Sequence, residues 1–223
     1  MRLLAAADIH GNLAVYDWLA NAVVGLQAET LVLAGDLLSG GSEQEQWRVS
    51  RRIISLLQRV PVPVLYLMGN DDWISLDYED EQVRPLHGKR LVFGGYGFAG
   101  YQYSLPFVGG IHEKPEHEIE KDLRPLEALL DERTVFVTHS PAFGTLDRVY
   151  GGGHAGSRSL AALLDRKHVL AHIHGHIHES FGRQGRHFNV ASAGVRRAVL
   201  IELPALNHQV CSGDSWRERR SWA

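Results

Sequence analysis

Three short apolar runs in the N-terminal third limit the folds open to this chain. They occupy residues 3–7 (LLAAA), 30–34 (TLVLA) and 62–68 (VPVLYLM). Runs of this length are typical of buried strands, whereas a buried helix needs a longer apolar pattern. Each run is separated from the next by a segment with helical periodicity. The order strand, helix, strand, helix, strand favours parallel strands joined by crossover helices.

The two segments between these runs carry helix start signals. Asn12 is a suitable N-cap, and the apolar residues after it share one helix face: Leu13, Tyr16, Leu19 and Val23. Ser42, with Glu45 three residues later, has the spacing of a capping box for a helix that runs towards Arg59. We therefore expect helices to follow both of the first two strands.

The rest of the chain is rich in strands. We expect them at residues 91–93, 134–138, 169–173, 188–191, 198–203 and 209–211, with a long loop over 94–121. Asp122 and Ser157 are candidate caps of two short helices. With 223 residues, 44% of them hydrophobic, the chain can form one core, so we expect a single domain over residues 1–223. The element order predicts an α/β sandwich of two face-to-face sheets with helices outside.

Polar side chains that can bind metal ions follow five of these apolar runs. Successive side chains of a strand alternate in direction, so residues two apart can face one ion. Open α/β sheets also bind ligands beyond the carboxyl ends of their strands. Taken alone, each cluster is compatible with a turn, a helix cap or a surface histidine. Together they predict one site formed by five segments: 8–10 (DIH), 35–36 (GD), 69–72 (GNDD), His139 and 172–178 (HIHGHIH).

The donor types restrict the ion. Carboxylate oxygen and imidazole nitrogen suit manganese, iron or zinc. The absence of cysteine near these positions argues against a thiolate zinc site and against an iron-sulfur cluster. Two such ions about 3.5–4 Å apart clamp a phosphoryl group and lower the pKa of bound water towards about 7. One carboxylate must bridge the pair, and Asp36 is the candidate.

These segments resemble the calcineurin-like metallophosphoesterase superfamily, whose pattern reads D-x-H, G-D, G-N-H-D/E, H and G-H-x-H. The resemblance extends over residues 8–178. It implies a four-layer α/β/β/α sandwich of two mixed sheets flanked by helices. It also implies a two-metal phosphoesterase in which metal-bound hydroxide attacks the phosphorus. The implied ligands are Asp8, His10, Asp36 and His178 for one ion, and Asp36, Asn70, His139 and His176 for the other.

One position departs from the family pattern. The histidine that usually follows the asparagine, and assists the leaving group, is Asp71 here. Ionised Asp71 beside Asp72 would repel a monoester dianion more than a diester monoanion, so we expect a phosphodiesterase acting on a small substrate. A raised pKa would instead let Asp71 act as a protonated acid.

A glycine-rich segment offers a further candidate. Residues 151–153 are all glycine and precede His154, which is a candidate contact for a substrate phosphate. A flexible surface turn is the alternative interpretation. The other histidines are expected to be ordinary surface or core residues: His112, His117, His168, His172, His174, His187 and His208.

Charge and cysteine content bear on partners and compartment. The net charge of −3 does not favour nucleic acid as a partner, and Arg217, Arg219 and Arg220 are typical of a solvated tail. No run approaches the roughly 20 apolar residues that span a bilayer. The single cysteine, Cys211, cannot form an internal disulfide, which favours the cytoplasm.

Manganese is the expected metal, with iron, zinc or magnesium as alternatives. Two other functions remain open from the sequence: a catalytically weak metal-binding interaction module with the same fold, and a nuclease. The natural substrate and the oligomeric state stay open as well.

Overall fold

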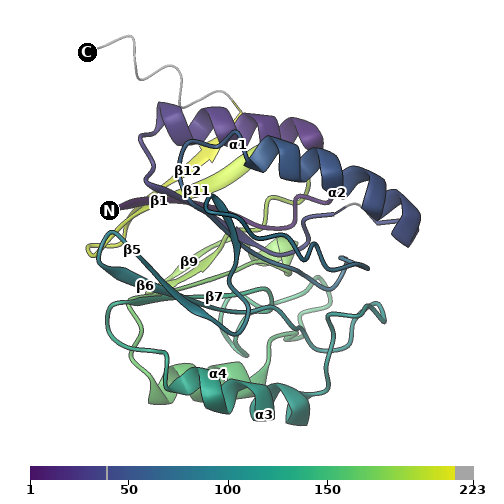
Figure 1. Cartoon of the computed structure of the whole chain (residues 1–223). Coiled ribbons are helices and arrows are strands. Elements are labelled where there is room, and N and C mark those ends of the chain that lie inside the picture. The colour runs from purple at the N-terminus through teal and green to yellow at the C-terminus, as the bar shows by residue number, and fades with distance from the viewer. Residues whose placement is uncertain (39, 214–223) are drawn as a thin grey trace.

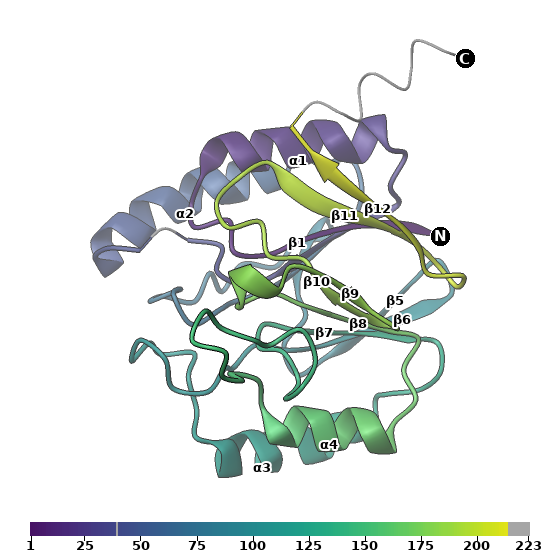
Figure 2. The same cartoon turned by 180° about the vertical axis from the view of Figure 1, so that it is seen from behind.

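Two sheets packed face to face form the centre of the protein. The computed structural model describes residues 1–38 and 40–213. Over those residues, two six-stranded mixed sheets lie between two pairs of α-helices, α1 and α2 on one side and α3 and α4 on the other (Figure 1, Figure 2). The predicted four-layer α/β/β/α sandwich is therefore confirmed. Arg217, Arg219 and Arg220 lie outside the described residues.

The first sheet has the strand order β12-β11-β1-β2-β3-β4. Strands β1 to β4 run parallel, β11 pairs antiparallel with β1, and β12 pairs antiparallel with β11 at the edge. The bounds are β1 Arg2–Ala6, β2 Thr30–Ala34, β3 Val64–Leu67, β4 Val83–Pro85, β11 Arg197–Glu202 and β12 Asn207–Ser212.

The second sheet has the order β5-β6-β7-β8-β10-β9. Its four central strands are parallel, and β5 and β9 are antiparallel edges. The bounds are β5 Arg90–Phe93, β6 Tyr96–Tyr101, β7 Thr134–Thr138, β8 Ala171–His174, β9 Gly182–Gln184 and β10 His187–Asn189.

Three of the four α-helices among the described residues begin where the capping residues predict. In α1 (Leu13–Gly25), the Asn12 side chain accepts from the Ala14 amide, and Ser42 and Glu45 form a capping box at the start of α2 (Glu43–Leu57). Ser157 accepts from the Leu160 amide at the start of α4 (Arg158–Arg166). The remaining helices are α3 (Glu116–Glu127) and the short 3₁₀ turn η1 (His178–Ser180).

Each central strand is buried on both faces. Along β1, Leu3 and Ala5 belong to the core between the sheets, while Leu4 and Ala6 belong to the core beneath α1 and α2. Burial on both faces explains why these strands appear as continuous apolar runs rather than as alternating patterns.

The expected long loop over residues 94–121 is wrong. That segment contains β6 (YGFAGY) and the start of α3. Glycine in the middle of β6 hides its strand pattern, and α3 buries only Ile119, Leu123 and Leu126 among many charged residues. The short edge strands β4 and β9 were also missed, because three residues carry no periodicity.

The expected cap Asp122 is wrong too. It lies inside α3, and its carboxylate accepts from the Tyr101 hydroxyl at 3.1 Å and from the Lys114 ammonium at 2.5 Å. The helix begins earlier, after Pro115, and Pro115 makes no side-chain cap bond. A tertiary contact to β6 therefore accounts for Asp122.

Candidate metal centre

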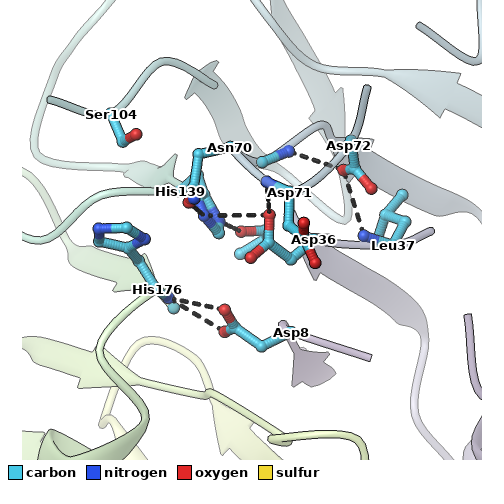
Figure 3. A network of polar contacts seen from close by, with 12 residues as sticks. Asp8, Asp36, Leu37, Asn70, Asp71, Asp72, Ser104, His139 and His176 are labelled. Atoms are coloured by element: carbon cyan, nitrogen blue, oxygen red, sulfur yellow. Dashed lines mark hydrogen bonds and ion pairs between the residues drawn. The ribbon is translucent and has the colours of Figure 1, made fainter. Parts of the chain in front are cut away.

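The segments that follow β1 and β2 are hydrogen-bonded to each other beyond the sheet. The Asp8 amide donates to the Gly35 carbonyl at 2.9 Å, and the His10 amide donates to the Asp36 carbonyl at 3.0 Å. Because these strands are parallel neighbours, their polar ends lie at one edge. The side chains that follow β1, β2, β3 and β7 lie together there (Figure 3).

Two groups of side chains at this edge could each hold an ion. Asp8, His10 and His178 place one donor atom each within 4.8 Å of one another, and so do Asp8, Asp36 and His139. Asp8 belongs to both groups, whereas Asp36 belongs to the second. The structure thus brings together five of the seven predicted ligand residues in two adjoining clusters.

The other two predicted ligand residues adjoin the second cluster. The Asn70 side-chain oxygen lies 2.9 Å from His139 Nε2, and the ring centroids of His139 and His176 are 5.1 Å apart. The His176 amide donates to both Asp8 carboxylate oxygens, at 3.1 and 3.0 Å (Figure 3). All seven predicted side chains therefore lie at one place.

The glycines of these motifs leave room for the donors. A Cβ atom at Gly69 would lie 2.2 Å from Asp36 Oδ1, and one at Gly175 would lie 2.3 Å from Asp8 Oδ2. Real Cβ atoms do not approach oxygen so closely, so any side chain at either position would displace a carboxylate. The glycines in G-N and G-H are thus explained by close approach.

Backbone strain is concentrated at the same residues. Asp8, His10, Asp36 and His176 have φ values of 55°, 49°, 50° and 69°, in the left-handed region. A backbone conformation of this kind costs about 1–2 kcal/mol of free energy for a residue other than glycine. Strain of this kind persists where surrounding contacts hold it, and it is common at functional sites.

The two carboxylates at the centre of the site are buried, so their ionised forms require a nearby positive charge. Asp8 and Asp36 are 0% and 4% exposed. Burial raises the pKa of Asp36, against the charge of His139. Burial also opposes ionisation of Asp8, but the His178 hydrogen bond and the charges of His139 and His10 hold its pKa below the usual value. Buried carboxylates need a compensating cation.

The imidazoles respond in opposite directions. Burial would lower the pKa of His10, yet the Asp71 hydrogen bond and the charges of Asp36 and Asp8 raise it to about 9. Burial, together with the His139 charge, lowers the pKa of His176 to about 3. His176 is therefore neutral, the form in which a histidine binds a metal, whereas His10 would release its ring proton to bind one. This donor set fits divalent ions of the manganese, iron or zinc type.

A neighbouring carbonyl orients His139. Its Nδ1 lies 2.9 Å from the Ala34 carbonyl oxygen, so Nδ1 carries a proton and donates there. The other nitrogen, Nε2, faces Asn70 and lies 3.4 Å from Asp36 Oδ1. Fixing one ring nitrogen by an outer hydrogen bond is the usual way that proteins aim a histidine at a metal.

Asp71 faces a predicted ligand. Its Oδ2 lies 3.2 Å from His10 Nδ1, and its amide donates to Asp36 Oδ1 at 2.9 Å. The second oxygen accepts from the Trp73 indole nitrogen at 3.4 Å. With Nδ1 engaged, His10 presents Nε2 to His178 Nε2, 3.4 Å away.

Two supporting residues were not singled out from the sequence. Asp72 is fully buried, and its carboxylate accepts hydrogen bonds from the amides of Leu37, Leu38 and Gly69, at 3.2, 2.7 and 2.7 Å. Burial, together with the Asp36 charge, raises the pKa of Asp72 to about 7. Gln46 of α2 donates to the Asp71 carbonyl and accepts from the Trp73 amide, at 2.9 and 2.7 Å. Asp72 stood in the G-N-D-D motif, but no local signal distinguishes Gln46.

His154 lies on the loop between β7 and α4. Its Nδ1 is 2.6 Å from Asp147 Oδ1, and its ring centroid is 5.0 Å from that of Phe143. The same loop contacts the segment of His178, because the Ser180 hydroxyl donates to the Arg148 carbonyl at 2.9 Å.

Two of the histidines left outside the site are fully buried in the second sheet. His172 and His174 are both 0% exposed, and His172 Nε2 lies 2.9 Å from the Thr138 hydroxyl.

The chain is similar to known proteins in sequence and in fold. The family described as calcineurin-like phosphoesterase matches residues 1–180. The Caenorhabditis elegans protein named UPF0046 protein K07C11.7 is 22% identical over 179 residues, which are 69% of this chain and 58% of that protein. The chain thus spans less than three fifths of the length of this curated relative.

Solved structures share the fold. TT1561 of Thermus thermophilus superposes with a TM-score of 0.75 at 17% identity, covering 95% of this chain and 98% of that one. A dimetal phosphatase from Danio rerio superposes with a TM-score of 0.63 at 12% identity, covering 95% and 98%. Among the described residues, the helices are too short or too polar to cross a bilayer.

Proposed function

Since this chain belongs to the calcineurin-like phosphoesterase family, we propose that it is a two-metal phosphodiesterase acting on a small phosphodiester. The observation that carries the proposal is the meeting of buried Asp8, Asp36 and His139 within 4.8 Å, beside a second group that shares Asp8. Few structural roles justify burying two carboxylates and an imidazole together at the ends of parallel strands.

The proposed ligands are those that the family pattern implies. Asp8, His10, Asp36 and His178 would hold one ion, and Asp36, Asn70, His139 and His176 the other, with manganese as the first candidate. Asp36 is the proposed bridging carboxylate. When bound, two such ions supply Lewis acidity towards the phosphoryl oxygens and an activated water.

Asp71 is proposed to position His10. By accepting from Nδ1, its carboxylate holds the ring so that Nε2 faces His178. A carboxylate behind a ligating histidine also increases the basicity of that ligand. This arrangement favours a positioning role for Asp71 over the role of proton donor to the leaving group.

The diester preference follows from the negative charge around the site. Bound cations would compensate Asp8 and Asp36, but Asp71 is not a proposed ligand, and it lies beside them with its amide donating to Asp36 Oδ1. Each additional charge on the substrate increases repulsion, so a monoester dianion is disfavoured relative to a diester monoanion.

His154 is retained as a proposed substrate contact. Asp147, which is 1% exposed, fixes the imidazole at Nδ1 and leaves Nε2 for a phosphate oxygen. The cytoplasm remains the proposed compartment, on the basis of the single, buried Cys211.

The decisive experiment combines elemental analysis with a substrate panel. The purified chain, reconstituted with manganese, is tested on bis(nitrophenyl) phosphate, nitrophenyl phosphate and cyclic nucleotides. We expect about two manganese ions per chain and faster turnover of the diester than of the monoester. Asp17→Asn, which changes a carboxylate 63% exposed on α1, is the control and should behave as the wild type.

Each contrary result has a distinct meaning. Metal binding without hydrolysis of any diester would favour an interaction module of the same fold. Salt-sensitive cleavage of RNA or DNA in preference to small diesters would favour a nuclease. Equal or faster turnover of the monoester would reject the diester preference.

A further inference from the structure

The loop between β6 and α3 exposes three large apolar side chains. Phe107, Val108 and Ile111 are 65%, 47% and 55% exposed. Residues 104–111 (SLPFVGGI) contain no charged residue. A cluster of exposed apolar residues costs free energy in water, and such clusters commonly mark a binding surface.

Internal hydrogen bonds hold this loop in one shape. The Glu113 carboxylate accepts from the Val108 and Gly109 amides, at 2.8 and 2.9 Å. The Ser104 amide donates to the His112 carbonyl at 3.1 Å, and the Lys114 amide donates to the Ser104 carbonyl at 2.9 Å. The apolar tip is thus presented by a loop whose base is closed by a parallel bridge between Ser104 and Glu113, and the Glu113 carboxylate is satisfied by two backbone amides of the tip.

The same loop contacts the candidate metal centre at two points. The Phe107 ring meets the His176 ring edge to face, with centroids 5.2 Å apart and an interplanar angle of 75°. At Gly110, a Cβ atom would lie 2.2 Å from the Asn70 carbonyl oxygen, so the loop backbone lies directly against that segment. The loop projects from the same edge of the molecule as the segment after β3 (Figure 1, Figure 2).

We propose that Phe107, Val108 and Ile111 form an apolar wall that binds the organic group of the ester held at the metal centre. The substrate would then carry an aromatic group next to its phosphate. The inference rests on the proposed function and deepens it, because it names the substrate class for the same site.

The geometry favours an aromatic group over a charged or sugar-like one. His176 occupies only one edge contact of Phe107, so most of the ring remains available for offset stacking or a T-shaped contact. The tip offers no ion pair, and its Val108 and Gly109 amides are already engaged by Glu113. Recognition at this wall is therefore by apolar contact.

Binding of two simple phosphonates to the manganese-loaded chain tests the wall without requiring turnover, and both are used as their monomethyl esters, which are monoanions like the proposed diester. Calorimetry should show that phenylphosphonate binds about tenfold more tightly than methylphosphonate. Phe107→Ala should reduce this ratio to about twofold or less, while methylphosphonate affinity stays within about twofold. Phe107→Leu should give an intermediate ratio. Val92→Ala, which changes a side chain 60% exposed on β5, is the matched control and should keep the wild-type ratio.

The possible failures separate the wall from the proposed function. If the manganese-loaded wild type binds neither phosphonate, the phosphoesterase proposal is rejected, and the proposal of an apolar wall is rejected with it. If it binds methylphosphonate but Phe107→Ala keeps the wild-type ratio, only the wall is overturned. Equal weakening of both phosphonates would also overturn it, because Phe107 would then merely steady His176. An unchanged ratio with altered sedimentation would assign the tip to contact between two copies of the chain.

Discussion

The two sheets contribute chemically different halves of the candidate metal centre. The segments after β1, β2 and β3 supply its oxygen donors, Asp8, Asp36 and Asn70, and one imidazole, whereas those after β7 and β8 supply imidazoles only. The oxygen half is braced by backbone amides and by the outer carboxylates Asp71 and Asp72. The difference suggests that the first sheet sets the charge of the site and the second completes its coordination.

The largest expected effect separates the two halves directly. Asp36→Asn removes a 4% exposed carboxylate proposed to bridge both ions, and we expect kcat/KM for a diester to fall at least about a thousandfold. His178→Ala removes an imidazole 40% exposed at the rim, with an expected loss of about a hundredfold. Steady-state kinetics and metal content measure both. A greater loss of kcat/KM for His178→Ala than for Asp36→Asn would contradict the proposed division of roles between the two sheets.

The second prediction concerns the bracing of the oxygen half. Asp71→Asn keeps the shape of the side chain but weakens the bond to His10 Nδ1, so manganese affinity should fall about 10- to 100-fold. Calorimetric titration measures the change, and excess manganese should restore most of the activity. Unchanged affinity with lost turnover, together with loss of one limb of the pH-rate profile, would instead identify Asp71 as a proton donor.

The third prediction concerns the second sheet apart from the metal centre. Burial, together with the Arg186 charge, lowers the pKa of His187 to about 4, so the folded chain holds this ring neutral. Below pH 6.5 the unfolded chain binds a proton that the folded chain does not. Stability from this group is therefore complete above pH 6.5 and falls by about 2 kcal/mol as the pH drops to about 4.

Urea unfolding at a series of pH values checks this dependence. His187→Gln should reduce the slope between pH 6.5 and about 4 without abolishing it, because burial also lowers the pKa values of His112 and His174 to about 4. The surface replacement His117→Gln should leave the slope unchanged. An identical slope in the wild type and His187→Gln would exclude His187 as its source.

The smallest expected effects compare helix caps on the two sides. Ser42→Ala removes an exposed cap of α2 and should cost about 1 kcal/mol of unfolding free energy. Ser157→Ala should cost about 2 kcal/mol, because the buried hydroxyl caps α4 and also donates to Glu116 of α3 at 2.6 Å. Chemical denaturation measures both, and equal costs would show that the contact to Glu116 contributes little.

Local signals predicted much of the fold. The strands Thr30–Ala34 and Thr134–Thr138 have the predicted bounds, since both are apolar on both faces and end at polar residues. The caps Asn12 and Ser157 are correct because a cap depends only on residues within one turn. Strand β6 and the start of α3 were missed, because glycines and charged residues there conceal elements that tertiary packing stabilises.

The sequence by itself determined the family and the order of the donor residues, because these are properties of short motifs. Only the tertiary structure decided that Asp71 faces His10, across 61 positions of the chain, and that Phe107 lies against His176. Both contacts join segments that follow different strands. Their partners are set by how two twisted sheets pack together, and residue type and spacing carry no record of that.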